Sequence, residues 1–256
     1  MNTFLPLYAE VFKTAMHYYD EVVEMHVKRL AEIDNILPPS STFLMLTNTA
    51  TYSYEFISKN IHYATGLTRE ELYVGGIKYL LSKVHPEDIQ IWIMALGDLM
   101  EFCMTNISET DRKRMSFQYN YRLQVRPDKV INVVENQVPL VLDSNGKPII
   151  GLGHFTVYDD GVFHPVKAYA RILNGNEEYE TVYFKNYGVQ HLLGGLSNRE
   201  QDILRLLALK NTSKEIGVKL FISSHTVDTH RRKILQKLNI SSTHEILNYC
   251  QENKLL

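Results

Sequence analysis

Five polar side chains near the C-terminal end have the types and spacing of a hydrogen-bonding surface. His225, Thr229, Arg232 and Gln236 follow one another at intervals of four, three and four residues, and Asp228 lies beside them. This spacing puts them on one face of a helix. Each can donate or accept hydrogen bonds, and none is an aliphatic anchor. Because base edges in the major groove of DNA present both donors and acceptors, such a face suits base readout.

The same stretch, about Ser224–Leu238, carries two further surfaces. Its inward face is apolar and repeats every three or four residues, through Val227, His230, Ile234 and Leu238. Arg231, Lys233 and Lys237 flank the polar face, where they could meet phosphates. The sequence therefore predicts a helix with one buried face, one hydrogen-bonding face and cationic edges.

Helix starts are marked by three hydroxyl residues that each precede a glutamate by three positions. The pairs are Ser197 with Glu200, Thr212 with Glu215, and Ser242 with Glu245. Ser223 is a further cap, so four short helices are predicted. The first buries Ile203, Leu204 and Leu207, and the second buries Ile216 and Leu220. The short turn 221–223 between the second and third helices has the length of a helix-turn-helix.

These residues resemble the LuxR/FixJ/GerE family of DNA-binding domains. The resemblance is carried by LSNRE (196–200), KEI (214–216), FISSHTVDTHRRKIL (221–235) and KLNI (237–240). Together with the helix spacing it implies base reading by His225, Asp228, Thr229 and Arg232. It implies backbone contacts by Lys214, Ser224, Thr226, Arg231, Lys233 and Lys237. Three positions depart from the family pattern: Asp228 stands where many members have Lys, Thr243 where many have Arg, and Gly217 where Ala is common.

Asp228 leaves two interpretations open. Its carboxylate could accept from a cytosine amino group, or it could serve only to hold Arg232 through an ion pair four residues along the helix.

Charge divides the chain into an acidic and a basic part. From Leu196 onward there are 10 Lys/Arg and 6 Asp/Glu, a net charge of +4, whereas the first 195 residues carry −6. This asymmetry is typical of a DNA-binding module joined to a domain with another role. The two cysteines, Cys103 and Cys250, lie far apart and lack metal spacing, so no metal site or disulfide framework is predicted. Without a signal sequence or an apolar run of about 18 residues, we expect a cytoplasmic protein that does not enter membranes.

The N-terminal region is predicted to be one long helix from about Pro6 to Leu37. Two neighbouring apolar stripes run along it, and Pro38-Pro39 ends it. A surface that wide either packs on its own domain or mediates self-association, and the sequence leaves both open.

The region from about Ser40 to Asp160 predicts two strands, a helical middle and three strands. The strands are expected at 42–46, 52–57, 115–125, 130–142 and 149–158. Helical pieces are expected at 60–64 and 68–72, and a longer helix from His85 to about Thr105. This order, with EFISKNIHYATGLTREEL (55–72), KVHPEDI (83–89) and DSNGKPIIGLGHFTVYD (143–159), resembles PAS sensor domains. PAS folds either hold a ligand between the sheet and the helical segment or act as dimerising switches.

No cofactor is predicted for this region, and any small-molecule PAS ligand is unidentified. The photosensory flavin motif Asn-Cys-Arg-Phe is absent, and Cys103 is expected to be a buried residue of the long helix. His62 and His85 are the candidates for a haem ligand, but His85 is better placed to cap a helix. Residues 166–173 and 179–185 predict a β-hairpin that extends the sheet or braces the DNA module, and Tyr187–Gly195 a linker with Gly194-Gly195 as hinge.

The expected fold class is therefore α+β. The predicted division is an N-terminal helix (1–38), a PAS-like sensor domain (39–160), a hairpin and linker (161–195), and a four-helix LuxR-type domain (196–256). We expect a transcriptional regulator without enzyme activity, because no phosphate loop or nucleophile elbow is present. Its expected partners are double-stranded DNA, a second copy of itself and RNA polymerase. Alternatives are a haem- or flavin-binding PAS sensor, and a response-regulator-like protein controlled by a partner protein.

Overall fold

The computed structural model describes residues 4–14, 20–158, 164–188, 196–238 and 240–252. The chain forms two compact units, Met1–Lys185 (unit 1) and Asn186–Leu256 (unit 2). Unit 1 combines an antiparallel sheet with helices and the described part of unit 2 is helical, which confirms the predicted α+β class. Among the described residues, no helix has both the length and the apolar character that a bilayer span needs.

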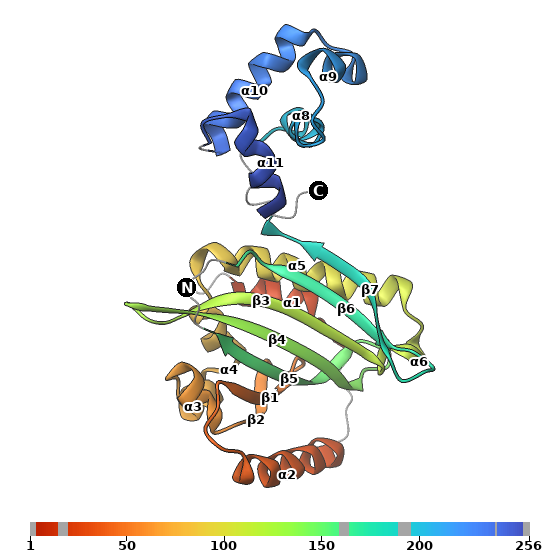
Figure 1. The fold of residues 1–256 in the computed structure, drawn as a ribbon. Helices are drawn as coiled ribbons and strands as arrows, with labels where there is room; N and C mark the ends of the chain where they lie inside the picture. The colour runs from red at the N-terminus through yellow and green to blue at the C-terminus, as the bar shows by residue number, and fades with distance from the viewer. Residues whose placement is uncertain (1–3, 15–19, 159–163, 189–195, 239, 253–256) are drawn as a thin grey trace. The chain divides into compact units, whose positions relative to one another are not determined.

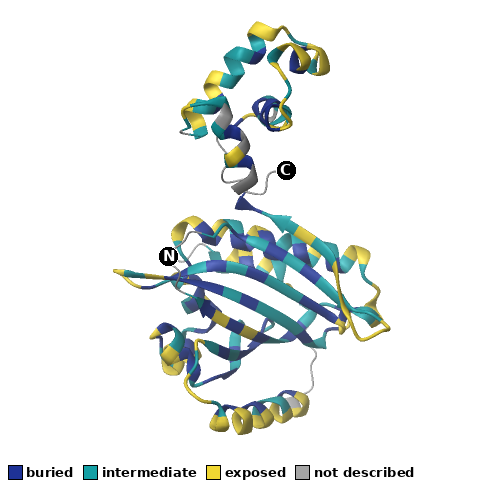
Figure 2. Cartoon of the chain, viewed as in Figure 1, coloured by how far each residue is buried: buried dark blue, intermediate teal, exposed yellow. Residues whose placement is uncertain are grey.

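Unit 1 is built on a seven-stranded sheet with the order β2-β1-β5-β4-β3-β6-β7 (Figure 1). Every pairing whose register is determined is antiparallel. The strands are β1 (Thr42–Asn48), β2 (Ser53–Ile57), β3 (Met115–Arg126), β4 (Lys129–Leu142), β5 (Pro148–Tyr158), β6 (Lys167–Leu173) and β7 (Tyr179–Asn186). The five strands predicted between residues 42 and 158 are thus confirmed. Figure 2 shows alternating buried and partly exposed bands along them, the period of two that the sequence pattern predicted.

Along the chain, the helices of unit 1 come before β1 and between β2 and β3. They are α1 (Phe4–Val11), α2 (Asp20–Ile36), α3 (Asn60–Thr65), α4 (Arg69–Lys83), α5 (Pro86–Asn106) and α6 (Glu109–Arg112). The predicted piece at 68–72 is longer than expected and continues to Lys83 through a kink. At the kink, Gly76 has a φ of 56°, and a Cβ there would lie 2.5 Å from the carbonyl oxygen of Tyr52.

The long helix α5 begins as predicted and carries the buried Cys103. Nδ1 of His85 accepts a hydrogen bond from the Glu87 amide at 3.3 Å, so His85 caps α5. Cys103 is 1% exposed, and burial raises the pKa of its thiol to about 11. Both residues therefore have the structural roles that the sequence analysis favoured.

The single N-terminal helix predicted from Pro6 to Leu37 is wrong. Residues 12–14 are not helical, so α1 and α2 are separate helices, and residues 15–19 of the predicted stripes lie outside the described residues. Lys147 Nζ donates to the carbonyl oxygens of Val11 at 3.5 Å and of Lys13 at 3.2 Å. These carbonyls therefore have a partner other than a continuing helix.

The two helices bury their apolar stripes in different places. Tyr8 of α1 packs near Trp92 of α5 and Tyr52, inside the unit. Val23 and Leu30 of α2 instead join an apolar cluster with Leu46, Phe56, Ile149 and Ile150 of the sheet. Both helices thus cover their own domain.

The hairpin β6-β7 extends the sheet beside β3, the first of the two roles considered for it. Ala168 to Ile172 pair antiparallel with Met115 to Tyr119. Lys185 Nζ on β7 also reaches Asp98 Oδ2 on α5 at 2.6 Å. Helix α1 and this hairpin thus belong to the same compact unit as the five central strands. The predicted hinge Gly194-Gly195 lies outside the described residues.

Candidate nucleic-acid interface

The described part of unit 2 contains four helices whose starts are fixed by side-chain caps. They are α8 (Asn198–Ala208), α9 (Ser213–Leu220), α10 (Ser224–Leu238) and α11 (Thr243–Glu252). Ser197 with Glu200, and Thr212 with Glu215, form the reciprocal capping boxes predicted from the sequence. Ser223 Oγ accepts from the Thr226 amide at 3.0 Å, as the sequence also predicted.

The start of α11 differs slightly from the predicted box. Ser242 Oγ accepts from the Glu245 amide at 3.4 Å, but the Glu245 carboxylate returns to the amide of Ser241, one residue earlier. The cap therefore spans one residue more than the pattern predicted.

The inward faces of the four helices form one apolar cluster. Its fully buried members include Ile203, Ile216, Val227 and Ile234, each at 0% exposure. Leu220 and Leu238, predicted to be inward, are partly buried against this cluster. Burying these residues stabilises α10 and leaves its opposite side available for binding.

A tight turn sets α10 against α9. Phe221 ends α9 in the left-handed region, at a φ of 56°, and its side chain is 94% exposed. Gly217 allows the turn to fold back, because a Cβ there would lie 2.7 Å from the Ile222 carbonyl oxygen. The close approach at Gly217 is thus made to the backbone of the turn. The turn was predicted from its length, but the exposure of the Phe221 ring was not.

The predicted base-reading face of α10 is open to solvent along most of its length. His225, Arg232 and Gln236 are exposed, and Asp228 and Thr229 are half-buried. Thr229 Oγ1 donates to the His225 carbonyl oxygen at 3.0 Å, which leaves the hydroxyl oxygen able to accept. Among the described residues, Arg232 has neither a hydrogen-bond nor an ion-pair partner for its guanidinium. Its five donors are therefore available to a ligand.

Asp228 has partners within the protein. Its Oδ1 accepts from Ser213 Oγ at 2.7 Å and lies 3.7 Å from an Arg231 guanidinium nitrogen. No contact with Arg232 is seen within the described residues, so the Asp228–Arg232 pair, one of the two interpretations left open by the sequence, is not the one that forms. The bond to Ser213 instead joins α10 to the first turn of α9, a link that sequence spacing along one helix could not reveal.

The predicted backbone-contacting residues fall into two groups. Lys214, Ser224 and Lys233 are exposed. Thr226 and Arg231 are partly buried, and Thr226 shares a hydrogen bond with Ser223 at 2.8 Å.

Lys237 is held by a partner within unit 2. Its Nζ donates to Glu200 Oε2 at 2.8 Å, and the Glu200 side chain is only 4% exposed. Burial raises the pKa of Glu200, but the bonds from Lys237 and Ser197 outweigh it and the net pKa is lowered. The Glu200 carboxylate therefore joins α8 to the last turn of α10, a contact between residues far apart in the sequence.

Comparisons with known proteins single out the same C-terminal region. Residues 195–250 match the family described as bacterial regulatory proteins, luxR family. The oxygen regulatory protein NreC of Staphylococcus carnosus is 48% identical over 61 residues, which are 24% of this chain and 28% of NreC. The virulence-factor transcription regulator BvgA of Bordetella pertussis is 41% identical over 64 residues, 25% of this chain and 31% of BvgA. The chain thus spans less than a third of these relatives.

Solved structures give weaker similarities over more of the chain. The phage VqmA–DPO complex covers 91% of this chain and 89% of VqmA at 14% identity and a TM-score of 0.36. The Vibrio cholerae VqmA dimer without target DNA covers 88% and 87% at 12% identity and a TM-score of 0.36. We draw no conclusion from similarities at this level.

Proposed function

Because residues 195–250 form a LuxR-family helix-turn-helix domain, we propose that this chain is a sequence-specific DNA-binding transcriptional regulator. In this proposal α10 enters the major groove, and unit 1 senses a signal or mediates dimerisation. The observation that carries it is the exposed hydrogen-bonding face of α10, fixed opposite a fully buried apolar face. An enzyme activity would require a different kind of site, and the family is one of transcription regulators.

Base reading is assigned to the exposed side of α10. Arg232, whose guanidinium has no partner among the described residues, suits bidentate bonding to guanine O6 and N7, the commonest specific contact in the major groove. Thr229 and His225 lie about one and two turns before Arg232 on the same face and suit single contacts. Asp228 can accept from a cytosine amino group only by sharing the carboxylate that holds Ser213. We therefore place Asp228 in this set as a residue with both roles.

Backbone contacts are assigned to the residues around this face. Lys214 and Lys233 are exposed cations, and Ser224 and Thr226 carry hydroxyls near the start of α10. Arg231 contributes a cation that is only loosely paired with Asp228. We propose that Lys237 stabilises unit 2 and does not contact a phosphate, because Glu200 already binds its ammonium group.

The roles proposed for unit 1 follow from its form. An antiparallel sheet with a helical segment inserted after two strands is the arrangement implied by the resemblance to PAS sensors. The outer side of α2 also leaves Met25, Ile33 and Ile36 exposed, at 42%, 46% and 81%. These residues suit contact with a second copy of the chain, since apolar side chains gathered on a surface mark association sites.

The salt dependence of binding to duplex DNA tests the proposal. For the full chain, the logarithm of the binding constant should fall linearly with the logarithm of salt concentration, by about 0.9 for each neutralised phosphate. Lys214→Ala should reduce this slope by about that amount. Arg205→Ala serves as the matched control, because Arg205 is an exposed cation on α8 outside the proposed interface. Binding that does not depend on salt would contradict the proposal.

A further inference from the structure

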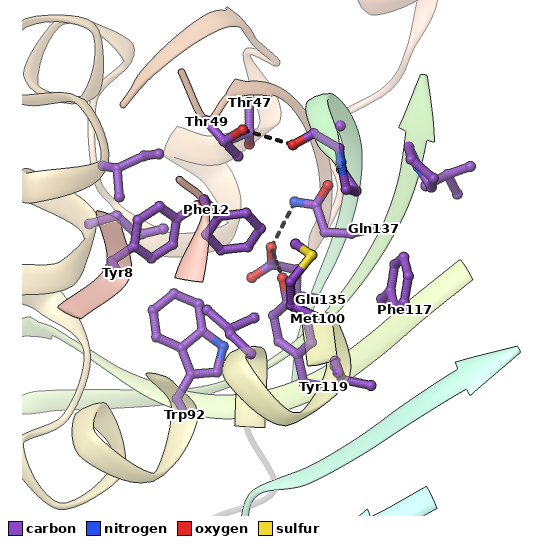
Figure 3. Close-up of a pocket in the computed structure, with 18 of the residues that line it drawn as sticks. Tyr8, Phe12, Thr47, Thr49, Trp92, Met100, Phe117, Tyr119, Glu135 and Gln137 are labelled. Carbon is purple, nitrogen blue, oxygen red and sulfur yellow. Dashed lines mark hydrogen bonds between the residues drawn. The ribbon is translucent and has the colours of Figure 1, made fainter. Parts of the chain in front are cut away.

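Unit 1 contains a cavity between the sheet and the helices α1, α4 and α5. It has a volume of about 80 Å³. Figure 3 shows Tyr8, Phe12, Trp92, Tyr119 and Glu135 around it, contributed by the N-terminal segment, α5, β3 and β4. One buried water needs roughly 10–15 Å³ by the same measure, so the cavity has room for about five to eight water molecules. It therefore has room for a small organic molecule.

The wall of the cavity is largely apolar, and its aromatic members are Tyr8, Phe12, Tyr54, Trp92, Phe117, Tyr119 and Phe155. The Trp92 indole packs 4.8 Å from the ring of Tyr121 and 6.0 Å from that of Tyr119, measured between centroids. Tyr8 lies on the other side, 6.5 Å from Trp92. Aromatic faces attract cations through their quadrupole, and most strongly when water is excluded.

A single carboxylate lies in this aromatic environment. Glu135 on β4 is 4% exposed. Its Oε1 accepts from Tyr119 Oη at 2.9 Å and from Gln137 Nε2 at 2.7 Å, and its Oε2 accepts from Tyr121 Oη at 2.7 Å. An ionised carboxylate has about four acceptor sites, so these three donors leave room for one more. No basic side chain among the described residues pairs with Glu135.

Without a counter-charge, the ionised form of the buried Glu135 carboxylate is disfavoured, and a cationic ligand can remove this penalty. Burial raises the pKa of Glu135, and the hydrogen bonds from Gln137, Tyr121 and Tyr119 only partly offset this. The other titratable groups around it are the phenols of Tyr8, Tyr54, Tyr119 and Tyr121, whose pKa values are also raised, mainly by burial. They stay neutral at physiological pH, so none of them balances the carboxylate.

The cavity wall also includes one donor without an acceptor. Nε1 of Trp92 is buried and has no hydrogen-bond partner among the described residues, and the whole residue is only 2% exposed. A buried N–H without an acceptor is rare, since it forfeits a hydrogen bond to water. Trp92 thus provides a second polar group at the cavity that lacks its complement within the described protein.

We propose that this cavity binds a small organic cation, a protonated amine whose ammonium group pairs with Glu135 and whose body lies against the aromatic wall. An acceptor atom on the same molecule would satisfy the Trp92 N–H. This deepens the sensing role proposed for unit 1 and rests on it. The ligand supplies the counter-charge that Glu135 lacks, and its body displaces water from an apolar surface.

Trp92 makes the proposal directly measurable. It is the chain's one tryptophan, so intrinsic fluorescence reports from the cavity itself. Full-length protein, without DNA, is titrated with benzylamine, which is protonated at neutral pH, and with its neutral isostere benzyl alcohol. We expect benzylamine to change the fluorescence saturably and to bind roughly tenfold or more tightly than benzyl alcohol, as for a hydrogen bond to a charged group. Its affinity should fall as the pH is lowered and Glu135 becomes protonated.

Two variants separate the charge of Glu135 from the shape of the site. Glu135→Gln keeps the size of the side chain and should remove the preference for benzylamine while retaining benzyl alcohol. Glu101→Gln removes an exposed carboxylate from α5 and should leave both affinities unchanged. Equal binding of the two probes to the native protein, binding of neither, or a preference that survives in Glu135→Gln would each overturn the proposal. None of these results bears on DNA binding, which is measured separately.

Discussion

Replacing Lys237 with alanine should destabilise unit 2 while leaving its electrostatic binding to DNA unchanged. Lys237 donates a hydrogen bond to Glu200, whose carboxylate also accepts a hydrogen bond from the Ser197 amide in the capping box of α8. Removing the ammonium group would leave a buried carboxylate without its cation. The loss should therefore appear in folding and not in the number of phosphates neutralised.

The size of the effect follows from the exposure of the two partners. Losing one partner of a fully buried pair costs about 3–5 kcal/mol, whereas exposed pairs contribute about 0–1 kcal/mol. The Lys237 side chain is 41% exposed and that of Glu200 4%. Because solvent screens the lysine, we expect a loss of about 1–2 kcal/mol. The pKa of Glu200 is lowered in the folded state, so this stabilisation should be complete above the ordinary carboxyl pKa and disappear as pH falls through the lowered value.

Urea unfolding and salt-dependent DNA binding together test this reasoning. Circular dichroism should show a lower unfolding midpoint for Lys237→Ala, while Trp92 fluorescence, which reports unit 1, should not change. Lys233→Ala is the matched control, because Lys233 is exposed on α10 without a partner among the described residues. The Lys233→Ala variant should keep its free energy of unfolding within about 0.5 kcal/mol of the native value. Its slope of log binding constant against log salt concentration should become shallower by about 0.9. If Lys237→Ala instead lost that slope and kept its stability, the assignment of Lys237 to the fold would be refuted.

Two further outcomes are expected for other surfaces. Asp228→Lys should tighten binding to all duplexes. If Asp228 reads a base, the substitution should also move the preference at one base pair per half-site from cytosine toward guanine by roughly 1–3 kcal/mol. Selection from random duplexes checks this, and an unaltered motif would restrict Asp228 to its bond with Ser213. Ile33→Asp should weaken self-association measured by sedimentation, because it puts a charge on the exposed side of α2, whereas Val74→Asp, at an even more exposed apolar site on α4, should not. Equal effects of the two substitutions would remove α2 from the interface.

Local sequence signals predicted most of the elements. Capping pairs located the starts of α8 and α9, and the period-two pattern located the five central strands within a few residues. These signals succeed because a cap or an alternating strand depends on residues close together in the chain. The polar face of α10 was predictable for the same reason, since its residues lie on one helix.

The errors arose where residues distant in sequence decide the local structure. Nothing near Val11 shows that Lys147 will bind the end of α1, so two helices were read as one. Ser213 is fifteen residues from Asp228, and Glu200 thirty-seven from Lys237, so neither contact follows from spacing along one helix. The cavity around Glu135 was not predicted either, because the sequence shows a strand glutamate without its buried aromatic neighbours.

The central claim, that α10 reads DNA sequence through its exposed face, is tested most directly by Arg232. Random duplexes bound by the full-length protein and by Arg232→Ala are selected and sequenced at the same salt concentration. The native protein should select a motif, and the variant should lose its preference at one guanine-containing base pair per half-site, by about 1–3 kcal/mol, and keep the other positions. Selection of the same motif by both proteins, or of no motif by the native protein, would contradict the account.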